Sequence, residues 1–143
     1  MEKERLKAKK NNYESPIHET KKACDQDFNY ALEYCIQNIN EIKIFAGTHN
    51  ENSCLKLIDL MKKNKIQKND DRVYFSQLLG MSDHISFNLS NKGYNVSKYV
   101  PFGPIKDMIP YLIRRAEENS SVKGQTSREL NLIDKELTRR SKI

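Results

Sequence analysis

The sequence predicts an α/β fold built from parallel strand–helix units. Three short runs rich in β-branched and aromatic residues alternate with amphipathic segments of helical period, which is the pattern of βαβ units. The 143 residues suffice for one ordinary domain. Three strands do not close a barrel, and a complete barrel of this kind takes ~250 residues. The chain is therefore expected to form either a small open sheet or the last part of a barrel.

Two helices are expected before the first strand. The charged segment 1–11 is predicted to be helical, and the segment 13–16 ends it, because the residue before Pro16 disfavours the helical conformation. Residues 19–39 carry apolar side chains at three-to-four spacing, which predicts a long amphipathic helix. The members of this stripe are Ala23, Phe28, Ala31, Leu32, Cys35, Ile36 and Ile39.

Strands and helices then alternate. The predicted strands are the runs 42–47, 73–79 and 97–100. The predicted helices are 52–64, 82–90, 105–119 and, after the loop 120–124, 126–141. In the first of these helices the side chains expected to face inward are Cys54, Leu55, Leu57, Ile58 and Met61.

The charge pattern argues against nucleic acid as a partner. Lysine and arginine number 25 against 19 acidic residues, a net charge of +6. The surplus lies in the two ends, 1–10 and 121–143, whereas residues 11–120 are balanced. A nucleic-acid binder usually concentrates basic charge on one face of its folded part. No run approaches the ~20 apolar residues that cross a bilayer, so no transmembrane segment is predicted.

Several catalytic and metal-binding patterns are missing. Cys24, Cys35 and Cys54 are odd in number and form no CxxC pair, so they are predicted to be small apolar residues in a reducing compartment. Histidine and cysteine form no cluster, so no metal site is expected. The phosphate-binding patterns GxGxxG and GxxxxGK[ST] and the serine pattern GxSxG do not occur.

Candidate site residues follow the ends of the predicted strands, where parallel α/β folds place their active residues. The first strand is followed by Thr48, His49 and Asn50. A histidine beside a hydroxyl and an amide suits a polar ligand, but a histidine that only caps the next helix or satisfies a carbonyl fits the position equally well. The other two places are the segments 77–78 and 99–104.

One face of the predicted helix 105–119 carries a second group of candidates. Tyr111, Arg114, Arg115 and Glu118 stand at the helical spacing i, i+3, i+4 and i+7. Two neighbouring guanidinium groups can hold a carboxylate through charge-assisted hydrogen bonds. The alternative is a solvated stripe of charges, with no ligand.

Four blocks of the sequence strongly resemble proline dehydrogenase, and most of all the monofunctional mitochondrial enzyme of eukaryotes. They are THNENS at 48–53, VYFSQLLGMSDHISF at 73–87, KYVPFGP at 98–104 and YLIRRAEENSSV at 111–122. The opening segment 1–20 also resembles the part of that family that follows the fifth barrel strand. The resemblance therefore covers essentially the whole chain.

The resemblance implies a flavin-binding (βα)8 barrel of the TIM type. Residues 1–143 would be the C-terminal part of this catalytic barrel, with its last three strands and their helices, and 124–143 would be a helical extension. The chain is thus expected to be a fragment, with the first five strands and any transit peptide upstream. The implied reaction is the FAD-dependent oxidation of L-proline to 1-pyrroline-5-carboxylate, with ubiquinone as acceptor. The implied location is mitochondrial, in the matrix or peripheral on the inner membrane.

The resemblance also implies roles for the substrate-binding residues. Arg114 and Arg115 would hold the carboxylate of proline as ion pairs. Tyr99 would pack on the proline ring, and Tyr111 would line the same pocket. Leu78 would form an apolar wall near the flavin.

For the cofactor, the resemblance implies that Thr48, His49 and Asn50 contact FAD. Glu118 would anchor the arginines and the ribityl region of the flavin. The chain departs from the family in lacking the first five strands, and Gly47 stands where alanine is expected.

Three other interpretations remain open. Hydroxyproline dehydrogenase resembles the chain too, but its pattern is expected to carry a small hydroxylated residue at the position of Tyr99, so the tyrosine favours proline. The chain could instead be a catalytically inactive, truncated half barrel that binds a partner, since an open sheet exposes two edges and an apolar face. The third interpretation is a basic α/β module that binds nucleic acid.

Overall fold

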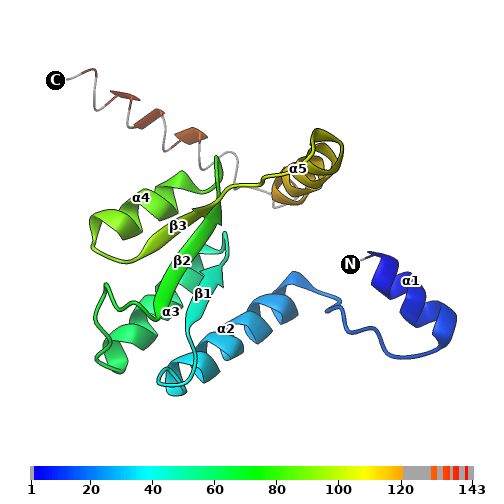
Figure 1. Cartoon of the computed structure of the whole chain (residues 1–143), viewed down its shortest axis with the longest axis horizontal. Coiled ribbons are helices and arrows are strands. Elements are labelled where there is room, and N and C mark those ends of the chain that lie inside the picture. Colours follow the sequence, from blue (N-terminus) through cyan, green and yellow to red (C-terminus); the bar gives the residue numbers. More distant parts are fainter. Residues whose placement is uncertain (1, 121–129, 132–133, 136, 139–140, 142–143) are drawn as a thin grey trace.

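The structure is a computed structural model that describes residues 2–120 and residues 130, 131, 134, 135, 137, 138 and 141. Its elements are, in order, α1 (Glu2–Asn11), α2 (Lys21–Gln37), β1 (Ile44–Gly47), α3 (Glu51–Lys63), β2 (Val73–Leu78), α4 (Asp83–Asn91), β3 (Val96–Tyr99) and α5 (Ile105–Ser120). This order confirms the predicted alternation (Figure 1). Residues 121–124 of the predicted loop and most of the predicted helix 126–141, with the proposed extension 124–143, lie outside the described residues.

The three strands form one parallel sheet in the order β1-β2-β3. In register, Phe45 pairs with Tyr74, and Leu78 pairs with Tyr99. Each connection between neighbouring strands is a helix, as a parallel crossover requires. Because all three strands run in one direction, their carboxyl ends lie at the same edge of the sheet.

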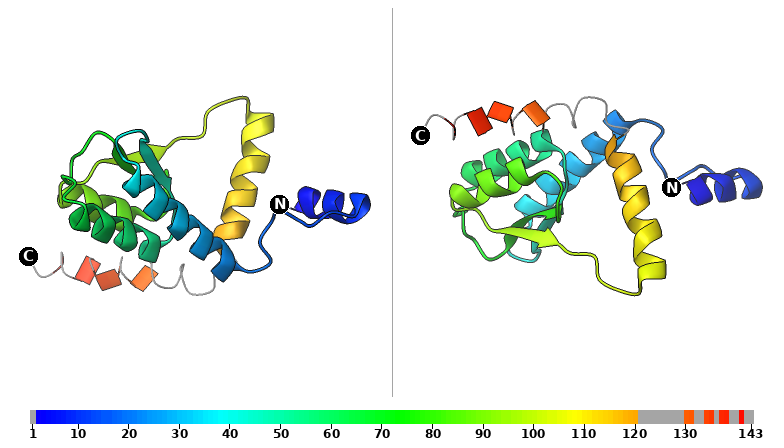
Figure 2. Two further views of the ribbon diagram at one scale, coloured as in Figure 1. Left: turned by 90° about the horizontal axis from the view of Figure 1, so that it is seen from below. Right: turned by 90° about the horizontal axis from the view of Figure 1, so that it is seen from above.

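The helices α2, α3 and α4 gather on one side of the sheet and bury the core (Figure 2). The buried members of this core are Leu32, Ile36, Ile44, Ala46, Cys54, Leu57, Met61, Val73, Phe75, Ile85, Leu89 and Tyr94. Phe75 in the central strand is fully buried, and its ring meets that of Tyr94 edge-on with centroids 5.6 Å apart. The helix-facing positions of the strands are therefore structural.

The prediction that Leu55 and Ala31 belong to the inward-facing stripes of their helices is wrong. Leu55 is 51% exposed, and Ala31 is exposed as well. The buried line of α3 runs along Cys54, Leu57 and Met61. Leu55 follows Cys54 by one residue, and a helix turns by about 100° per residue, so its side chain leaves that line.

The opposite face of the sheet carries aromatic side chains. Phe45 and Tyr74 stack there with ring centroids 5.7 Å apart and an interplanar angle of 18°, and Phe45 is 64% exposed. All-parallel sheets are normally covered on both faces. Among the described helices, α5 stands apart from α3 and α4 at the end of the segment 100–104 (Figure 2), and α1 lies beyond the amino end of α2 (Figure 1).

Candidate functional site

The predicted site residues lie along the carboxyl edge of the sheet. Thr48 follows β1 directly and is joined to β2, because its N–H donates to the carbonyl of Ser76 at 3.1 Å. Leu78 and Tyr99 end β2 and β3 and are paired in register. Side chains alternate between the two faces of a strand, so these two lie on the face that α2–α4 leave uncovered. The carboxyl edge thus carries the candidates that follow the strands.

Tyr99, Tyr111 and Arg115 form a contact cluster between β3 and α5. The rings of Tyr99 and Tyr111 meet edge-on, with centroids 6.3 Å apart and an interplanar angle of 74°. The guanidinium carbon of Arg115 lies 5.4 Å from the centre of the Tyr111 ring, a cation–π contact. Tyr99 is 54% exposed and Arg115 is half-buried. The contact of Tyr111 with Arg115 agrees with the helical spacing, and Tyr99 joins the pair from β3.

The rest of the predicted arginine face is described only in part. Arg114 follows Ile113 on α5 and is exposed. Glu118 belongs to the same helix, but its side chain lies outside the described part of the chain. The implied role of Glu118 as an anchor of the arginines therefore stays a prediction.

Local hydrogen bonds determine the shape of the segment 48–50. The Oδ1 atom of Asn50 accepts the N–H of Asn52 at 3.0 Å and caps α3. The Oγ1 atom of Thr48 accepts the N–H of Asn50 at 3.0 Å. The cap of α3 is thus Asn50 and not His49, so the alternative in which the histidine caps this helix is wrong. The hydroxyl of Thr48 and the amide NH2 of Asn50 keep donors with which they can bind a ligand.

His49 makes a different kind of contact. Its Nδ1 atom lies 2.8 Å from Oγ of Ser82, in the loop between β2 and α4. This contact joins residues 33 positions apart in the chain. It links the segment after β1 to the loop that follows Leu78.

Sequence reasoning named Gln77 as a candidate but missed that it belongs, with Ser86 and Lys98, to the polar contacts that support this edge. Gln77 is only 2% exposed, and its Nε2 atom donates to the carbonyl of Thr48 at 3.1 Å. Its Oε1 atom accepts from the hydroxyl of Ser86 at 2.8 Å. Lys98 donates to the carbonyl of Met81 at 2.9 Å and to the carboxylate of Asp83 at 2.6 Å. The signal in the sequence for this network was Gln77 itself, which lies on the core-facing side of β2 with Val73 and Phe75.

The thiols differ in their surroundings. Cys54 is 3% exposed, and burial raises its pKa to about 11. Cys35 is half-buried against the core, but Cys24 is exposed, so the predicted apolar role is wrong for Cys24.

Within the described residues, no group of three or more histidine, cysteine or acidic side chains could hold a metal ion. No described helix is both long and apolar enough to span a bilayer.

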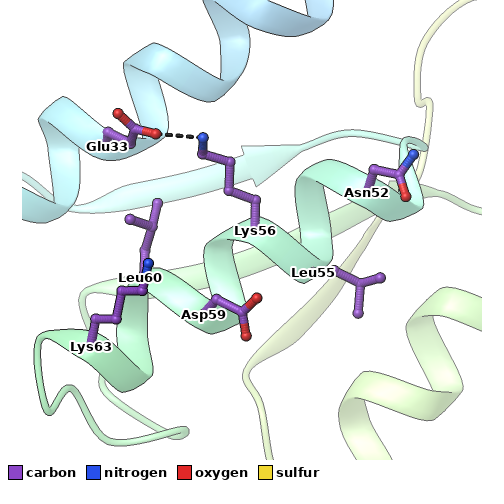
Figure 3. A pocket seen from close by; sticks show the side chains of 7 residues that line it. All are labelled: Glu33, Asn52, Leu55, Lys56, Asp59, Leu60 and Lys63. Carbon is purple, nitrogen blue, oxygen red and sulfur yellow. Dashed lines mark ion pairs between the residues drawn. The ribbon is translucent and has the colours of Figure 1, made fainter.

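A groove of about 330 Å³ lies between α2 and α3, on the outer side of the helical layer. Figure 3 shows that Glu33 and Lys56 form an ion pair across it. Its lining consists of Glu33, Asn52, Leu55, Lys56, Asp59, Leu60 and Lys63. None of these is a predicted site residue, and acids and lysines alternate around the groove, so it has no part in the candidate site.

The family model for proline dehydrogenase matches residues 1–128. This chain belongs to the proline dehydrogenase family. The predicted family is therefore confirmed over nearly the whole sequence.

Individual proline dehydrogenases agree with this assignment. Proline dehydrogenase 1, mitochondrial, of Homo sapiens is 41% identical over 140 residues, which cover 96% of this chain and 23% of that protein. Hydroxyproline dehydrogenase of Xenopus laevis is 38% identical over 144 residues, which cover 98% of this chain and 31% of that protein. The chain thus spans less than a third of either relative. Relatives from Homo sapiens, Bos taurus and Arabidopsis thaliana are mitochondrial by name, which supports the predicted location.

A solved structure shows the same fold. The crystal structure of proline utilization A from Bdellovibrio bacteriovorus, inactivated by N-propargylglycine, has a TM-score of 0.77 and 25% identity to this chain. The match covers 85% of this chain and 12% of that one. The α/β arrangement with its small parallel sheet is therefore the arrangement of part of a protein that handles proline.

Proposed function

We propose that this chain is the C-terminal part of an FAD-dependent proline dehydrogenase barrel. The complete protein would oxidise L-proline to 1-pyrroline-5-carboxylate and pass the electrons to a quinone at the inner mitochondrial membrane. The observation that carries the proposal is the cluster of Tyr99, Tyr111 and Arg115 at the carboxyl edge of a parallel sheet. TIM barrels carry their active sites at this edge.

The uncovered face of the sheet supports the barrel assignment. It presents Phe45 and Tyr74 from neighbouring strands, whereas the helical face holds the apolar core. In a closed barrel this inner face packs against the side chains of the remaining strands. Residues 1–143 would supply three of eight strands, and 124–143 a helical extension.

The cluster has the chemistry needed to bind an amino acid with an apolar ring. Arg115, with Arg114 beside it on α5, offers guanidinium groups for the carboxylate. Tyr99 and Tyr111 offer aromatic surface to the pyrrolidine ring, and Leu78 supplies an apolar wall next to Tyr99. Holding both ends of a small substrate fixes its orientation, which is a large part of the rate enhancement in such reactions.

The residues present fit FAD as a cofactor. Thr48, His49 and Asn50 bring a hydroxyl, an imidazole and an amide to the same edge, and these groups suit the ribityl hydroxyls and the phosphates. The hydroxyl of Ser97 in β3 is buried without a hydrogen-bond partner among the described residues, so a polar ligand there would satisfy it. Glu118 would add a carboxylate near the arginines. When bound, FAD supplies the acceptor for the hydride that proline loses.

Hydroxyproline is the second candidate substrate. Its support is the Xenopus laevis relative, which matches the chain almost end to end. Tyr99 decides between the two, because its large ring would occupy the space needed by a 4-hydroxyl group. Substitution of Tyr99 by serine should therefore raise turnover of hydroxyproline relative to proline. An unchanged ratio would show that Tyr99 does not select the substrate.

A chimera tests the main proposal. Residues 1–128 would replace the matching segment of the human relative, and proline oxidation would be followed with a soluble quinone. Arg115→Met and Arg114→Met should each raise KM for proline by about 10- to 100-fold, because each removes a charge-assisted contact. Retained FAD would show that the variants fold.

Arg5→Met, in α1, is the matched control and should leave KM unchanged. An active chimera whose arginine variants keep the original KM would refute the carboxylate contact. A chimera that retains FAD but does not oxidise proline would favour the inactive half barrel.

A further inference from the structure

We propose that Ser82 is a positioning residue that holds the imidazole of His49 in one tautomer for contact with the flavin. The inference rests on the proposed function, because that function gives His49 its ligand. Its physical basis is the short contact between His49 Nδ1 and Ser82 Oγ, at 2.8 Å.

The conformation of Ser82 is unusual for its place in the fold. It is the N-cap residue of α4, where a serine hydroxyl normally accepts an N–H from the first helical turn. Here the side chain makes no such bond, and the backbone is left-handed, with φ 51° and ψ 41°. Non-glycine residues adopt this conformation at a cost, and they cluster at functional sites. The cap bond is thus absent at Ser82, and its hydroxyl bonds to His49 instead.

The backbone carbonyl of Ser82 takes over the start of α4. It accepts the N–H groups of Ile85 and Ser86 at 3.0 and 3.2 Å. The helix therefore begins without the serine hydroxyl, which remains available for His49. Ser82 is 2% exposed, so this hydroxyl does not exchange freely between the imidazole and bulk water.

The surrounding network holds both partners in place. Gln77 donates to the carbonyl of Thr48, the residue before His49. Ser86 donates to Gln77 at 2.8 Å and lies within 3.3 Å of the Ser82 carbonyl. The segment after β1 and the loop after β2 are thus tied at two points, and a shift of either would disturb the orientation of the ring.

We assign the tautomer from the ligand that the proposed function gives His49, because the Ser82 hydroxyl can either donate to Nδ1 or accept from it. A serine hydroxyl can donate to an unprotonated Nδ1, and the neutral ring then carries its hydrogen on Nε2. The oxygen-rich parts of FAD, its phosphates and ribityl hydroxyls, accept hydrogen bonds. A ring held with Nε2–H is the form that can donate to them. At many metal sites, a neighbouring residue holds the orientation of a ligand-binding histidine through a hydrogen bond to the ring nitrogen that does not face the ligand.

The first measurement is the ¹⁵N spectrum of the imidazoles in the full 143-residue chain, at a pH where histidine is neutral. The inference expects His49 to carry its hydrogen on Nε2 and to have a hydrogen-bonded Nδ1. Ser82→Gly removes the hydroxyl and also relieves the left-handed backbone, so loss of stability cannot explain its effect. Ser82→Ala removes the hydroxyl and keeps the strain. Both variants should shift the Nδ1 resonance of His49.

Ser53→Ala is the matched control. Ser53 is also buried, at 1% exposure, and its hydroxyl has no hydrogen-bond partner among the described residues. This variant should leave the His49 resonances where they are. A hydrogen on Nδ1 in the wild type, or an unshifted Nδ1 in Ser82→Gly, would overturn the inference.

The second measurement is the Kd of FAD, in the chain or, if the chain alone does not retain flavin, in the chimera with the human relative. Ser82→Gly and Ser82→Ala should each weaken binding by about three- to tenfold, the worth of one hydrogen bond, and Ser53→Ala should not. Shifted resonances with unchanged Kd would overturn the positioning role. Failure of FAD to bind any form would count against the proposed function, while the ¹⁵N result would still decide the contact and the tautomer.

Discussion

Asp70→Asn tests how the amino edge of the sheet stabilises the fold. The Oδ1 atom of Asp70 accepts the side-chain Nε and the backbone N–H of Arg72 at 2.8 and 3.0 Å, and Oδ2 accepts Nη2 at 2.7 Å. The hydrogen bond from the Arg72 side chain lowers the pKa of Asp70 from 3.8 to about 2. The Asp70 side chain is 13% exposed and that of Arg72 is 33% exposed. The carboxylate of Asp70 is therefore mostly buried, whereas solvent still reaches the side chain of Arg72.

The shift sets the size of the expected effect. Nearly two pKa units correspond to at most about 2.4 kcal/mol of folding free energy. Solvent screening at Arg72 reduces this, so we expect Asp70→Asn to cost about 1–2 kcal/mol at pH 7. Because the pKa of Asp70 is lower in the folded state, this stability is complete above pH ~4 and is lost as the pH falls towards 2. The measurement is urea unfolding of both proteins at pH 7 and at pH 2.5.

The neighbouring acid provides the control. Asp71 is 80% exposed and lies 3.4 Å from Lys43, so Asp71→Asn should cost less than about 0.5 kcal/mol. Equal costs for the two variants would refute the assignment of stability to the Asp70–Arg72 pair. So would a difference between wild type and Asp70→Asn that persists unchanged at pH 2.5.

Two further predictions concern the helical face of the sheet. Leu57 is fully buried, so Leu57→Ala should lower the free energy of unfolding by about 2–5 kcal/mol in the same urea assay; a loss below 1 kcal/mol would show a loosely packed core. Cys24 is exposed and should react quickly with a thiol reagent at pH 8, whereas Cys54, whose pKa is raised to about 11 by burial, should react only after unfolding. Similar rates for the two thiols in the native chain would contradict the burial of Cys54.

The order of elements could be predicted from the sequence because each element carries its own periodicity. The apolar stripe of α2 and the short β-branched strands are local features, and the structure contains both. Periodicity fails at single positions, as Leu55 shows. The spacing marks a broad stripe, and only the packing of α3 against its neighbours decides which edge of the stripe is buried.

The candidate site likewise has contacts that could be predicted from the sequence and contacts that could not. Tyr111 and Arg115 are predicted to lie together because residues four positions apart share one face of a helix. The structure shows that they are in contact. The contact between His49 and Ser82 could not be predicted, since it joins two loops that only the parallel pairing of β1 and β2 brings together. Nothing in the sequence indicates that Ser82 adopts a left-handed conformation, because serine at a helix start normally acts as a cap.

The two edges of the sheet show how stability and function are separated in this fold. At the amino edge, Asp70 satisfies both the side chain and the backbone of Arg72, and its own carbonyl accepts from Asn95 at 2.7 Å. At the carboxyl edge, the Tyr99 side chain is half-exposed and Ser82 has a left-handed backbone, a conformation that costs a non-glycine residue folding free energy. Such features persist where a ligand or further structure compensates for them. Substitutions at Asp70 should therefore change unfolding and leave FAD binding intact, whereas Ser82→Gly should weaken FAD binding without loss of stability.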